Sequence, residues 1–274
     1  MISINQQFIN VTTFPNGESL IKTDQFNKSG KYYSIDVSFE NNNDLFLLTI
    51  LKGHFDECGI QCRLNISYMP YSRMDRTDGS VIFTLKYVCR YINNLNFYKV
   101  RVIEPHSDVT PALLNNCEVV YITPTIVEKI ISSFKPHNPV LFFPDAGALK
   151  RYTPLFKGFG SIPMAWGNKH RDFATGKITG LTVMDSEVIT PDSTVIIVDD
   201  LCSYGGTFIK AGEELRKLGA SKIFLAVAHC ERAILHGDIF TTDIIDQVIT
   251  STSIIQPNDT VEQQFKKLNF YNNI

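Results

Sequence analysis

The chain has 274 residues, a formal net charge of −2 and 44% hydrophobic residues. This length and apolar content can bury a sizeable core, and they indicate one large domain or two of ordinary size. The balanced charge gives no electrostatic reason to expect nucleic-acid or membrane binding, and no apolar run approaches the ~20 residues that a membrane span needs. Six cysteines in so long a chain, with no visible signal peptide, predict reduced thiols in a cytoplasmic protein.

Short apolar runs alternate with longer segments of helical spacing along the chain. The runs that predict strands are residues 45–50, 63–70, 99–105, 139–144, 193–200 and 222–229. The segments whose apolar residues recur at helical spacing are residues 81–95 and 206–220, and Gly219 is a helix stop signal near the end of the second. Apolar strands that alternate with helices are typical of parallel sheets covered on both faces, so the sequence predicts an α/β fold.

The pattern fits two α/β units in succession. Their join is expected in the segment 132–139, which contains two prolines, so we predict an N-terminal domain over residues 1–132 and a C-terminal domain over residues 133–274. In open parallel sheets, ligands bind beyond the carboxyl ends of the strands. Functional residues are therefore expected directly after the apolar runs.

Two adjacent carboxylates end the run 193–200. Asp199 and Asp200 follow four apolar residues, and the loop 201–207 then leads through two glycines and a threonine into the helical segment. The carboxylates could hold ribose hydroxyls or metal-bound water, and the free amides at the helix start favour a phosphate. A polar turn with an aspartate helix cap is the alternative, although adjacent carboxylates repel unless a cation or a hydroxyl group lies between them.

One group of residues has the composition of a metal site. His54, Cys58 and Cys62 are spaced four apart, so on a helix they would share one face. The paired spacings of zinc sites are absent and no fourth ligand is obvious. Small thiols buried on a core helix are the preferred interpretation.

The loop 199–207 resembles the binding loop of type I phosphoribosyltransferases and of the ribose-phosphate pyrophosphokinase (phosphoribosyl pyrophosphate synthetase) family. Five further segments, in the right order and with similar spacing, resemble the second of these families. They are "FPNGES" (14–19), "YMPYSRMDR" (68–76), "EPHSD" (104–108), "FPDAGALKRY" (143–152) and "GNKHRD" (167–172). On these residues the chain is identified as a short, divergent member of the pyrophosphokinase family.

The resemblance implies a fold and an activity. The fold is two successive type I phosphoribosyltransferase-like domains, each a mainly parallel sheet flanked by helices. The activity is transfer of the β,γ-diphosphoryl group of ATP to the anomeric hydroxyl of ribose 5-phosphate, in which the protein mainly positions and neutralises charge. The implied cofactor is Mg²⁺, and the implied partners are ATP, a ribose 5-phosphate-type molecule and further copies of the chain in a dimer or hexamer, without nucleic acid or membrane.

The resemblance also implies ATP contacts in the first domain. They are Phe14, Asn16, Glu18, Arg73, Asp75 and Arg76. Phe14 would stack on adenine, with Asn16 and Glu18 at its polar edge, and the arginines would offer planar forks to the phosphates. Phe14 as a core residue is the alternative; for the arginines it is a surface ion pair with Asp75 or Asp78.

His106 and Asp145 are the implied ligands of the Mg²⁺ that ATP carries, although a capped or solvated histidine remains open for His106. Lys169 and Arg171 are the implied catalytic residues, which would close over the transferring diphosphoryl group and stabilise its charge. A solvated basic loop is the alternative for these two.

The ribose-phosphate site departs from the family pattern. Its implied residues are Asp199, Asp200, Ser203, Tyr204, Gly205, Gly206 and Thr207. The family carries a further aspartate and then a threonine where this chain has Ser203 and Tyr204. Because a tyrosine could stack on a flat base, an acceptor with an esterified 5′-phosphate such as ADP-ribose is a hypothesis beside ribose 5-phosphate; Tyr204 pointing to solvent is the alternative.

Two other functions fit parts of the sequence. A phosphoribosyltransferase would share the loop 199–207, and a non-catalytic regulatory relative would share the fold. The segment 73–76 and the pair Lys169 and Arg171 favour the pyrophosphokinase over both.

Overall fold

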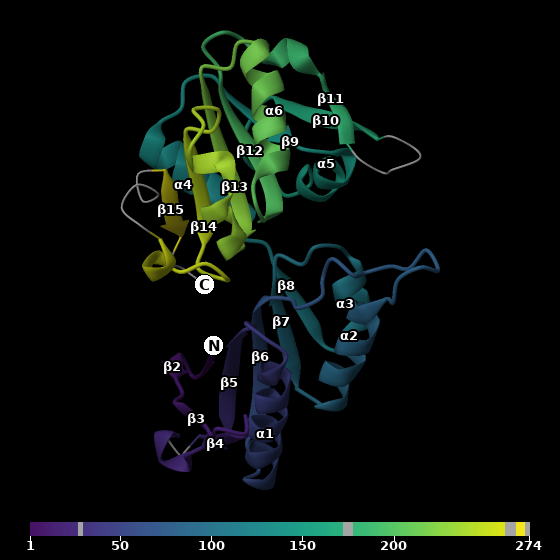
Figure 1. Ribbon diagram of the computed structural model, residues 1–274, viewed down its shortest axis with the longest axis vertical. Helices are drawn as coiled ribbons and strands as arrows, with labels where there is room; N and C mark the ends of the chain where they lie inside the picture. The colour runs from purple at the N-terminus through teal and green to yellow at the C-terminus, as the bar shows by residue number, and fades with distance from the viewer. Residues whose placement is uncertain (27–29, 172–177, 261–266, 272–274) are drawn as a thin grey trace. The chain divides into compact units, whose positions relative to one another are not determined.

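The computed structural model describes residues 1–26, 30–171, 178–260 and 267–271. The chain divides into two compact units, Met1–Tyr121 (unit 1) and Ile122–Ile274 (unit 2), which are drawn in Figure 1. Helix α4 (Thr123–Phe134) packs on strands of unit 2, so the boundary between the compact units comes before α4, whereas the segment 132–139 expected for the join begins in the last turn of this helix and ends at the start of the next strand. The two-domain assignment as independently folding parts stays a prediction.

Unit 1 is built on a six-stranded sheet in the order β2-β1-β5-β6-β7-β8. Its strands are β1 (Ile2–Ile4), β2 (Gln7–Phe8), β5 (Tyr32–Ser38), β6 (Gln61–Tyr68), β7 (Lys99–Ile103) and β8 (Cys117–Val120). The strands from β5 to β8 are parallel, and β1 runs antiparallel to β2 and β5. The connecting helices are α1 (Asn43–Glu57), α2 (Thr84–Asn94) and α3 (Val109–Leu113), and a separate hairpin pairs β3 (Val11–Thr13) with β4 (Ser19–Ile21).

The strand predicted at residues 45–50 is wrong, because this run lies inside α1. The buried residues of α1 include Leu47, Leu48, Leu51 and Phe55, a spacing that only a helix brings to one face. A short apolar run cannot by itself be assigned to a strand or a helix. The fifteen-residue length of α1 distinguishes the two, and it becomes visible only when the polar residues after Ile50 are counted in.

The strands of unit 1 alternate between buried and half-buried residues instead of being apolar throughout. In β5, Tyr33, Ile35 and Val37 are buried, while Ser34 and Asp36 are half-buried. The buried face packs with α1 and α2 in one hydrophobic core. On the other face, Asp36 accepts a hydrogen bond from the Ser34 hydroxyl at 3.2 Å, so polar residues of this sheet contact one another there.

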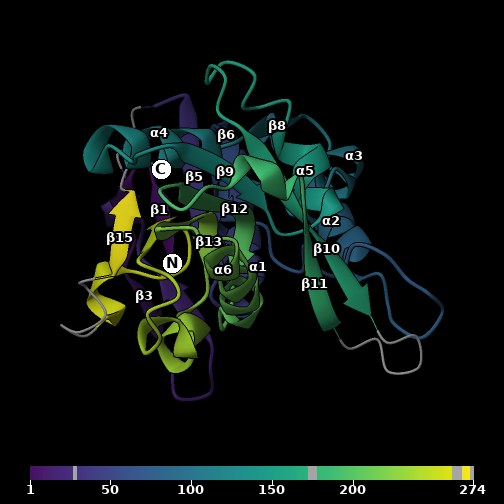
Figure 2. The same cartoon turned by 90° about the horizontal axis from the view of Figure 1, so that it is seen from above.

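Unit 2 carries a seven-stranded sheet in the order β11-β10-β9-β12-β13-β14-β15, parallel except for the β10–β11 hairpin. Its strands are β9 (Pro139–Phe143), β10 (Met164–Arg171), β11 (Ile178–Met184), β12 (Thr194–Cys202), β13 (Lys222–Cys230), β14 (Gln247–Ser251) and β15 (Leu268–Tyr271). Helices α4 and α6 (Gly206–Lys217) lie on opposite faces of the sheet in Figure 2, and the short helix α5 (Ala146–Tyr152) packs near β9, β10 and β12. The predicted α/β class, with mainly parallel sheets flanked by helices, is confirmed.

Short 3-10 turns complete the described chain. They are Thr23–Gln25, Ser186–Val188, Arg232–His236, Asp238–Phe240 and Pro257–Asp259. In the part of the chain described, no helix is long and apolar enough to cross a membrane.

The common helix face predicted for His54, Cys58 and Cys62 is wrong. Helix α1 ends at Glu57, and Cys62 lies buried in β6. Burial raises the pKa of the Cys62 thiol to about 12, so it is protonated, whereas a metal ligand must be a thiolate. Cys58, just after the helix, is exposed, so the expectation of thiols buried on a core helix is also wrong, and only Cys62 is a buried thiol, on a strand.

Truncation of the unit 1 core should lower its stability. Leu48 is completely buried, so Leu48→Ala is expected to reduce the free energy of unfolding by about 2–5 kcal/mol. Urea unfolding followed by circular dichroism measures the loss. Phe46→Ala on the same helix, at a side chain that is 58% exposed, is the matched control and should change stability by less than about 0.5 kcal/mol. Equal losses in the two variants would contradict the core assignment.

Candidate functional site

The two carboxylates predicted at a strand end lie on the central strand of unit 2. Strand β12 is flanked by β9 and β13 and runs two residues beyond Asp200, to Cys202, which pairs with Cys230 of β13. Asp200 is 4% exposed and Asp199 is half-buried. The backbone N–H of Asp200 donates to Asp199 Oδ1 at 2.9 Å. Both side chains therefore project from a fixed strand and not from a flexible loop.

An arginine that the sequence analysis did not assign balances one of these carboxylates. Arg151 Nη1, from the end of α5, lies 3.0 Å from Asp200 Oδ1, and the two side chains are only 19% and 6% exposed. Burial disfavours the charge of Arg151, but Asp200, Tyr152 and Asp199 together outweigh burial and raise the pKa of the guanidinium above its ordinary value. Asp200 and Arg151 thus form a shielded ion pair at the end of β12.

Asp199 behaves differently from its neighbour. Burial first, and then the negative charge of Asp200, raise the pKa of Asp199 well above its ordinary value of 3.8. Asp200 is thus balanced by Arg151, whereas the raised pKa of Asp199 favours its protonated form. The two neighbouring acids therefore differ in how readily they ionise.

The loop after β12 is fixed by two glycines. Gly205 has a φ of +88°, a conformation that glycine adopts without steric cost, and its carbonyl accepts hydrogen bonds from the N–H groups of Phe208 and Ile209. A Cβ at Gly237 would lie 2.0 Å from the carbonyl oxygen of Tyr204, so only a glycine fits against the loop. The Tyr204 side chain is 62% exposed, and its ring is available to a ligand or to solvent.

Lys169 is held on a strand and faces a carboxylate. It lies in β10, and its Nζ is 2.7 Å from Asp145 Oδ2, while Asp145 caps α5 by accepting the Ala148 N–H at 3.0 Å. Burial would raise the pKa of Asp145, but the hydrogen bonds from Lys169 and Ala148 lower it below its ordinary value. Because Lys169 is only 14% exposed, the solvated-loop alternative is wrong for this residue; the side chain of Arg171 lies outside the described part.

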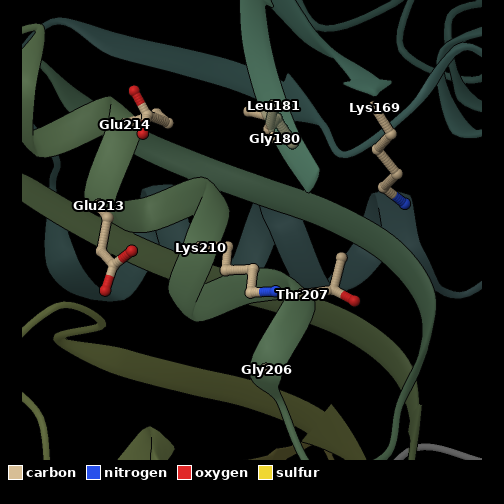
Figure 3. A pocket seen from close by; sticks show the side chains of 8 residues that line it. All are labelled: Lys169, Gly180, Leu181, Gly206, Thr207, Lys210, Glu213 and Glu214. Carbon is tan, nitrogen blue, oxygen red and sulfur yellow. The ribbon is translucent and has the colours of Figure 1, made fainter. Parts of the chain in front are cut away.

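A cavity of about 330 Å³ lies between the β10–β11 hairpin and the start of α6. Its lining residues are Lys169, Gly180, Leu181, Gly206, Thr207, Lys210, Glu213 and Glu214. Figure 3 shows Lys169 reaching toward the cavity from the strand side, and Thr207 and Lys210 on the helix side. Lys210 was not predicted as a site residue, although it lies three residues after Thr207, the helical spacing that places two side chains on one face.

In unit 1, the residues expected to contact adenine form a hairpin tip. The backbone N–H of Phe14 donates to the Glu18 carbonyl, and Gly17, with a φ of +89°, closes the turn between β3 and β4. The Asn16 amide donates to Glu18 Oε2 at 2.8 Å. The core alternative for Phe14 is wrong, since its side chain is 47% exposed.

The arginine segment and the histidine of unit 1 come together after β6 and β7. Asp75 is buried, and Arg76 Nε lies 2.9 Å from Asp75 Oδ1 while most of the Arg76 side chain is exposed. Burial would raise the pKa of Asp75, but Ser107, Arg76 and the nearby His106 lower it below its ordinary value. The contact of Arg76 with Asp75 is the ion pair given above as the alternative for this arginine, and Arg73 is exposed; the ATP contacts of the segment stay a prediction.

The two predicted metal ligands belong to different units. His106 follows β7 in unit 1, and Asp145 follows β9 in unit 2. Among the described residues, no three histidine, cysteine or acidic side chains form a metal-holding group. Asp145 alone offers a partly exposed, ionised carboxylate, which suits a cation that is bound mainly by phosphates and water.

Removal of the carboxyl group of Asp199 should stabilise the protein in a pH-dependent way. A raised pKa in the fold contributes stability that is complete below pH 3.8 and is lost as the pH rises toward the folded pKa. Asn has no proton to lose, so Asp199→Asn should match the wild type near pH 3.5 and unfold at a higher temperature at pH 7. Each pKa unit by which the fold raises Asp199 corresponds to about 1.4 kcal/mol.

Thermal unfolding in EDTA at the two pH values measures this difference. Asp192→Asn is the control of opposite sign, because hydrogen bonds from Thr190 and Asn138 lower the pKa of Asp192, so its loss should not stabilise the protein at pH 7. A stability gain for Asp199→Asn that is the same at both pH values would contradict the raised pKa.

Comparison with solved structures supports the fold. Phosphoribosylpyrophosphate synthetase from Mycobacterium smegmatis aligns over 97% of this chain and 86% of its own, with a TM-score of 0.77 at 16% sequence identity. At that identity the likeness shows the fold alone.

Comparison with known sequences gives the family. The ribose-phosphate pyrophosphokinase of Vibrio parahaemolyticus serotype O3:K6 is 26% identical over 249 residues, which cover 89% of this chain and 78% of the relative. The ribose-phosphate pyrophosphokinase of Sulfolobus acidocaldarius is 27% identical over 265 residues, covering 92% of this chain and 89% of the relative. The phosphoribosyl transferase domain model matches residues 111–259, more than half of the chain. The chain therefore belongs to the phosphoribosyl transferase domain family, and within it the expected membership of the ribose-phosphate pyrophosphokinases is confirmed.

Proposed function

We propose that the chain is a ribose-phosphate diphosphokinase that converts ATP and ribose 5-phosphate into phosphoribosyl pyrophosphate and AMP. In this reaction the anomeric oxygen bonds to the β-phosphorus of ATP, the bond from that phosphorus to the α,β-bridging oxygen breaks, and the hydroxyl proton is released. The names of the curated relatives support this activity. We further propose that the enzyme acts in the cytoplasm as a homo-oligomer, without nucleic-acid or membrane partners.

The observation that carries the proposal is the cavity of unit 2. Lys169 and the first residues of α6, Gly206 and Thr207, line the same space, so a cationic side chain and the amides of a helix N-terminus converge on it. Helix N-termini bind phosphates through free N–H groups, and a lysine adds a point charge. A diphosphoryl group moving between a nucleotide and a sugar phosphate requires this combination of charges.

The acids at the end of β12 complete the acceptor side. Asp200, paired with Arg151, would accept a hydrogen bond from one ribose hydroxyl. Asp199, whose pKa is raised, would hold another through its carboxyl group. The loop of Ser203, Tyr204 and Gly205 would then receive the phosphate side of the sugar, next to Gly206 and Thr207.

The donor side would be formed by unit 1. Phe14 offers an exposed ring for the adenine, beside Asn16 and Glu18, and Arg73 and Arg76 offer exposed guanidinium groups for the phosphates. His106 and Asp145 would hold Mg²⁺, which when bound to ATP neutralises phosphate charge. Lys169 would add positive charge at the transferring group, with Arg171 as its proposed companion.

Phosphorus NMR of the purified protein with ATP, Mg²⁺ and ribose 5-phosphate tests the activity. AMP and a new diphosphate signal in equal amounts would support the proposal. Formation of AMP with free diphosphate and no sugar product would indicate hydrolysis instead. The absence of AMP would favour a non-catalytic regulatory relative, and consumption of phosphoribosyl pyrophosphate with a base would favour a phosphoribosyltransferase.

Lys169→Ala should lower kcat about 100–1000-fold and change ATP affinity by much less, because its charge acts mainly on the transition state. Steady-state kinetics and equilibrium ATP binding measure the two effects separately. Lys157→Ala, at an exposed lysine of the same unit, is the control and should leave both unchanged. A parallel loss of kcat and ATP affinity would make Lys169 a ground-state binding residue.

A second candidate is the same transfer onto a 5′-substituted ribose such as ADP-ribose. Its basis is the sequence departure at Tyr204, in the loop that would receive the 5′-phosphate; the ring is 62% exposed, which fits stacking on a ligand and solvation alike. An aromatic ring can stack on a base that a phosphodiester carries, whereas the threonine usual in the family suits a terminal phosphate.

Tyr204→Thr separates the two acceptors. If ADP-ribose is used, this change should raise its KM about 5–10-fold, the loss expected from one stacking contact, and should improve or preserve the KM of ribose 5-phosphate. Parallel assays with both acceptors measure the ratio. Wild-type turnover with ribose 5-phosphate alone, unaffected by Tyr204→Thr, would exclude the second candidate and leave the ring as a solvated side chain.

A further inference from the structure

Helix α5 is placed so that both of its ends meet the site. Its N-cap, Asp145, forms an ion pair with Lys169 of β10. Its last turn carries Arg151, which forms an ion pair with Asp200 of β12. The helix is only seven residues long, so the two ion pairs lie close together along the chain. Arg151 therefore contacts a residue of the proposed site, although the proposed function gives Arg151 itself no role.

The side chain of Arg151 is held in place by its neighbours. Its guanidinium carbon lies 5.8 Å from the ring centroid of Tyr152, which is completely buried, and Nη1 is buried against Asp200. Strand β12 pairs with β13 through Asp199 and Leu201, so the backbone at Asp200 is fixed. Rotation of the Asp200 side chain is the remaining freedom, and the ion pair with Arg151 restricts it.

A purely stabilising role explains this arrangement poorly. A buried ion pair gains little net stability, because the loss of hydration opposes the attraction of the charges, and apolar replacements of the same size often serve as well. Here the acidic partner is one of the two carboxylates proposed to bind the sugar. A charge-assisted contact that fixes the carboxylate before the sugar arrives lowers the ordering cost of binding.

We propose that Arg151 is a positioning residue that holds Asp200 in the orientation required by the ribose hydroxyls, so that it contributes to the affinity for the sugar phosphate and not to that for ATP. This inference rests on the proposed function. It assigns Arg151 no contact with the substrate and no part in the transfer itself.

The test compares Arg151→Met with Lys150→Met. Arg151→Met keeps the length and apolar stem of the side chain and removes its charge, whereas Lys150, the exposed neighbour on the same helix, serves as the matched control. Arg151→Met should raise the KM of ribose 5-phosphate about 10–100-fold, the loss typical when a supporting partner of a binding group is removed, and should change the KM of ATP by less than about 2-fold. Lys150→Met should change neither.

Two further measurements separate positioning from support of the fold. Arg151→Lys retains a cation and should recover part of the lost sugar-phosphate affinity in calorimetric titration with ribose 5-phosphate. Arg151→Met with Asp200→Asn removes both charges, so it should unfold at a higher temperature than Arg151→Met alone and still bind ribose 5-phosphate weakly. Recovery of full sugar affinity in this double variant would overturn the proposal, because only the unpaired charge would then have mattered.

The outcomes distinguish this inference from the proposed function. If the wild type forms no AMP with ribose 5-phosphate and does not bind it in the titration, the proposed function fails. If the wild type is active and Arg151→Met raises the KM of both substrates equally, or of neither, the proposed function stands and the positioning role is wrong.

Discussion

The placement of two adjacent carboxylates at the end of a buried central strand is the constraint on which the rest of unit 2 depends. Strand β12 lies between β9 and β13, and most of its residues are completely buried, so Asp199 and Asp200 emerge where the dielectric is low. Two charges there would repel strongly. Asp200 is balanced by the cation of Arg151, whereas the pKa of Asp199 is raised, so the two neighbouring acids differ in how readily they carry a charge.

A second ion pair of unit 2 is built on the same helix as the first. Arg151, which balances Asp200, and Asp145, which balances Lys169, belong to the two ends of one short helix. The two pairs differ in their acids, since Asp145 keeps 43% of its side chain in solvent and Asp200 only 6%, whereas both cations are largely buried. Under the proposed function, the shielded pair holds the acid that binds the sugar, and the more exposed pair holds the lysine that acts on the diphosphoryl group.

Sequence reasoning found those parts of the fold whose cause is local. The buried strands of unit 2 are continuous apolar runs, and a charge at the end of such a run is costly enough to indicate a site, so Asp199 and Asp200 could be recognised. The sequence does not predict β5, because its polar and apolar residues alternate, and it predicts a strand at residues 45–50, because a short apolar run fits either period. Arg151 and Lys210 were not found, since their roles depend on which elements meet in space: α5 with β12, and the β10–β11 hairpin with α6.

In the loop between β12 and α6, the backbone conformation is constrained, whereas two of the side chains can differ without changing it. Gly205 adopts a left-handed conformation, and Gly237 leaves no room for a side chain against the carbonyl of Tyr204, so the path of the loop is determined by two glycines. The side chains of Ser203 and Tyr204 are not part of that determination, because Tyr204 is mostly exposed and Ser203 is half-buried. These positions can change without moving the amides of the loop. Within this loop the departure from the family pattern falls on these two positions, so under the proposed function it would alter what is recognised beyond the phosphate and leave the backbone amides proposed to bind the phosphate in place.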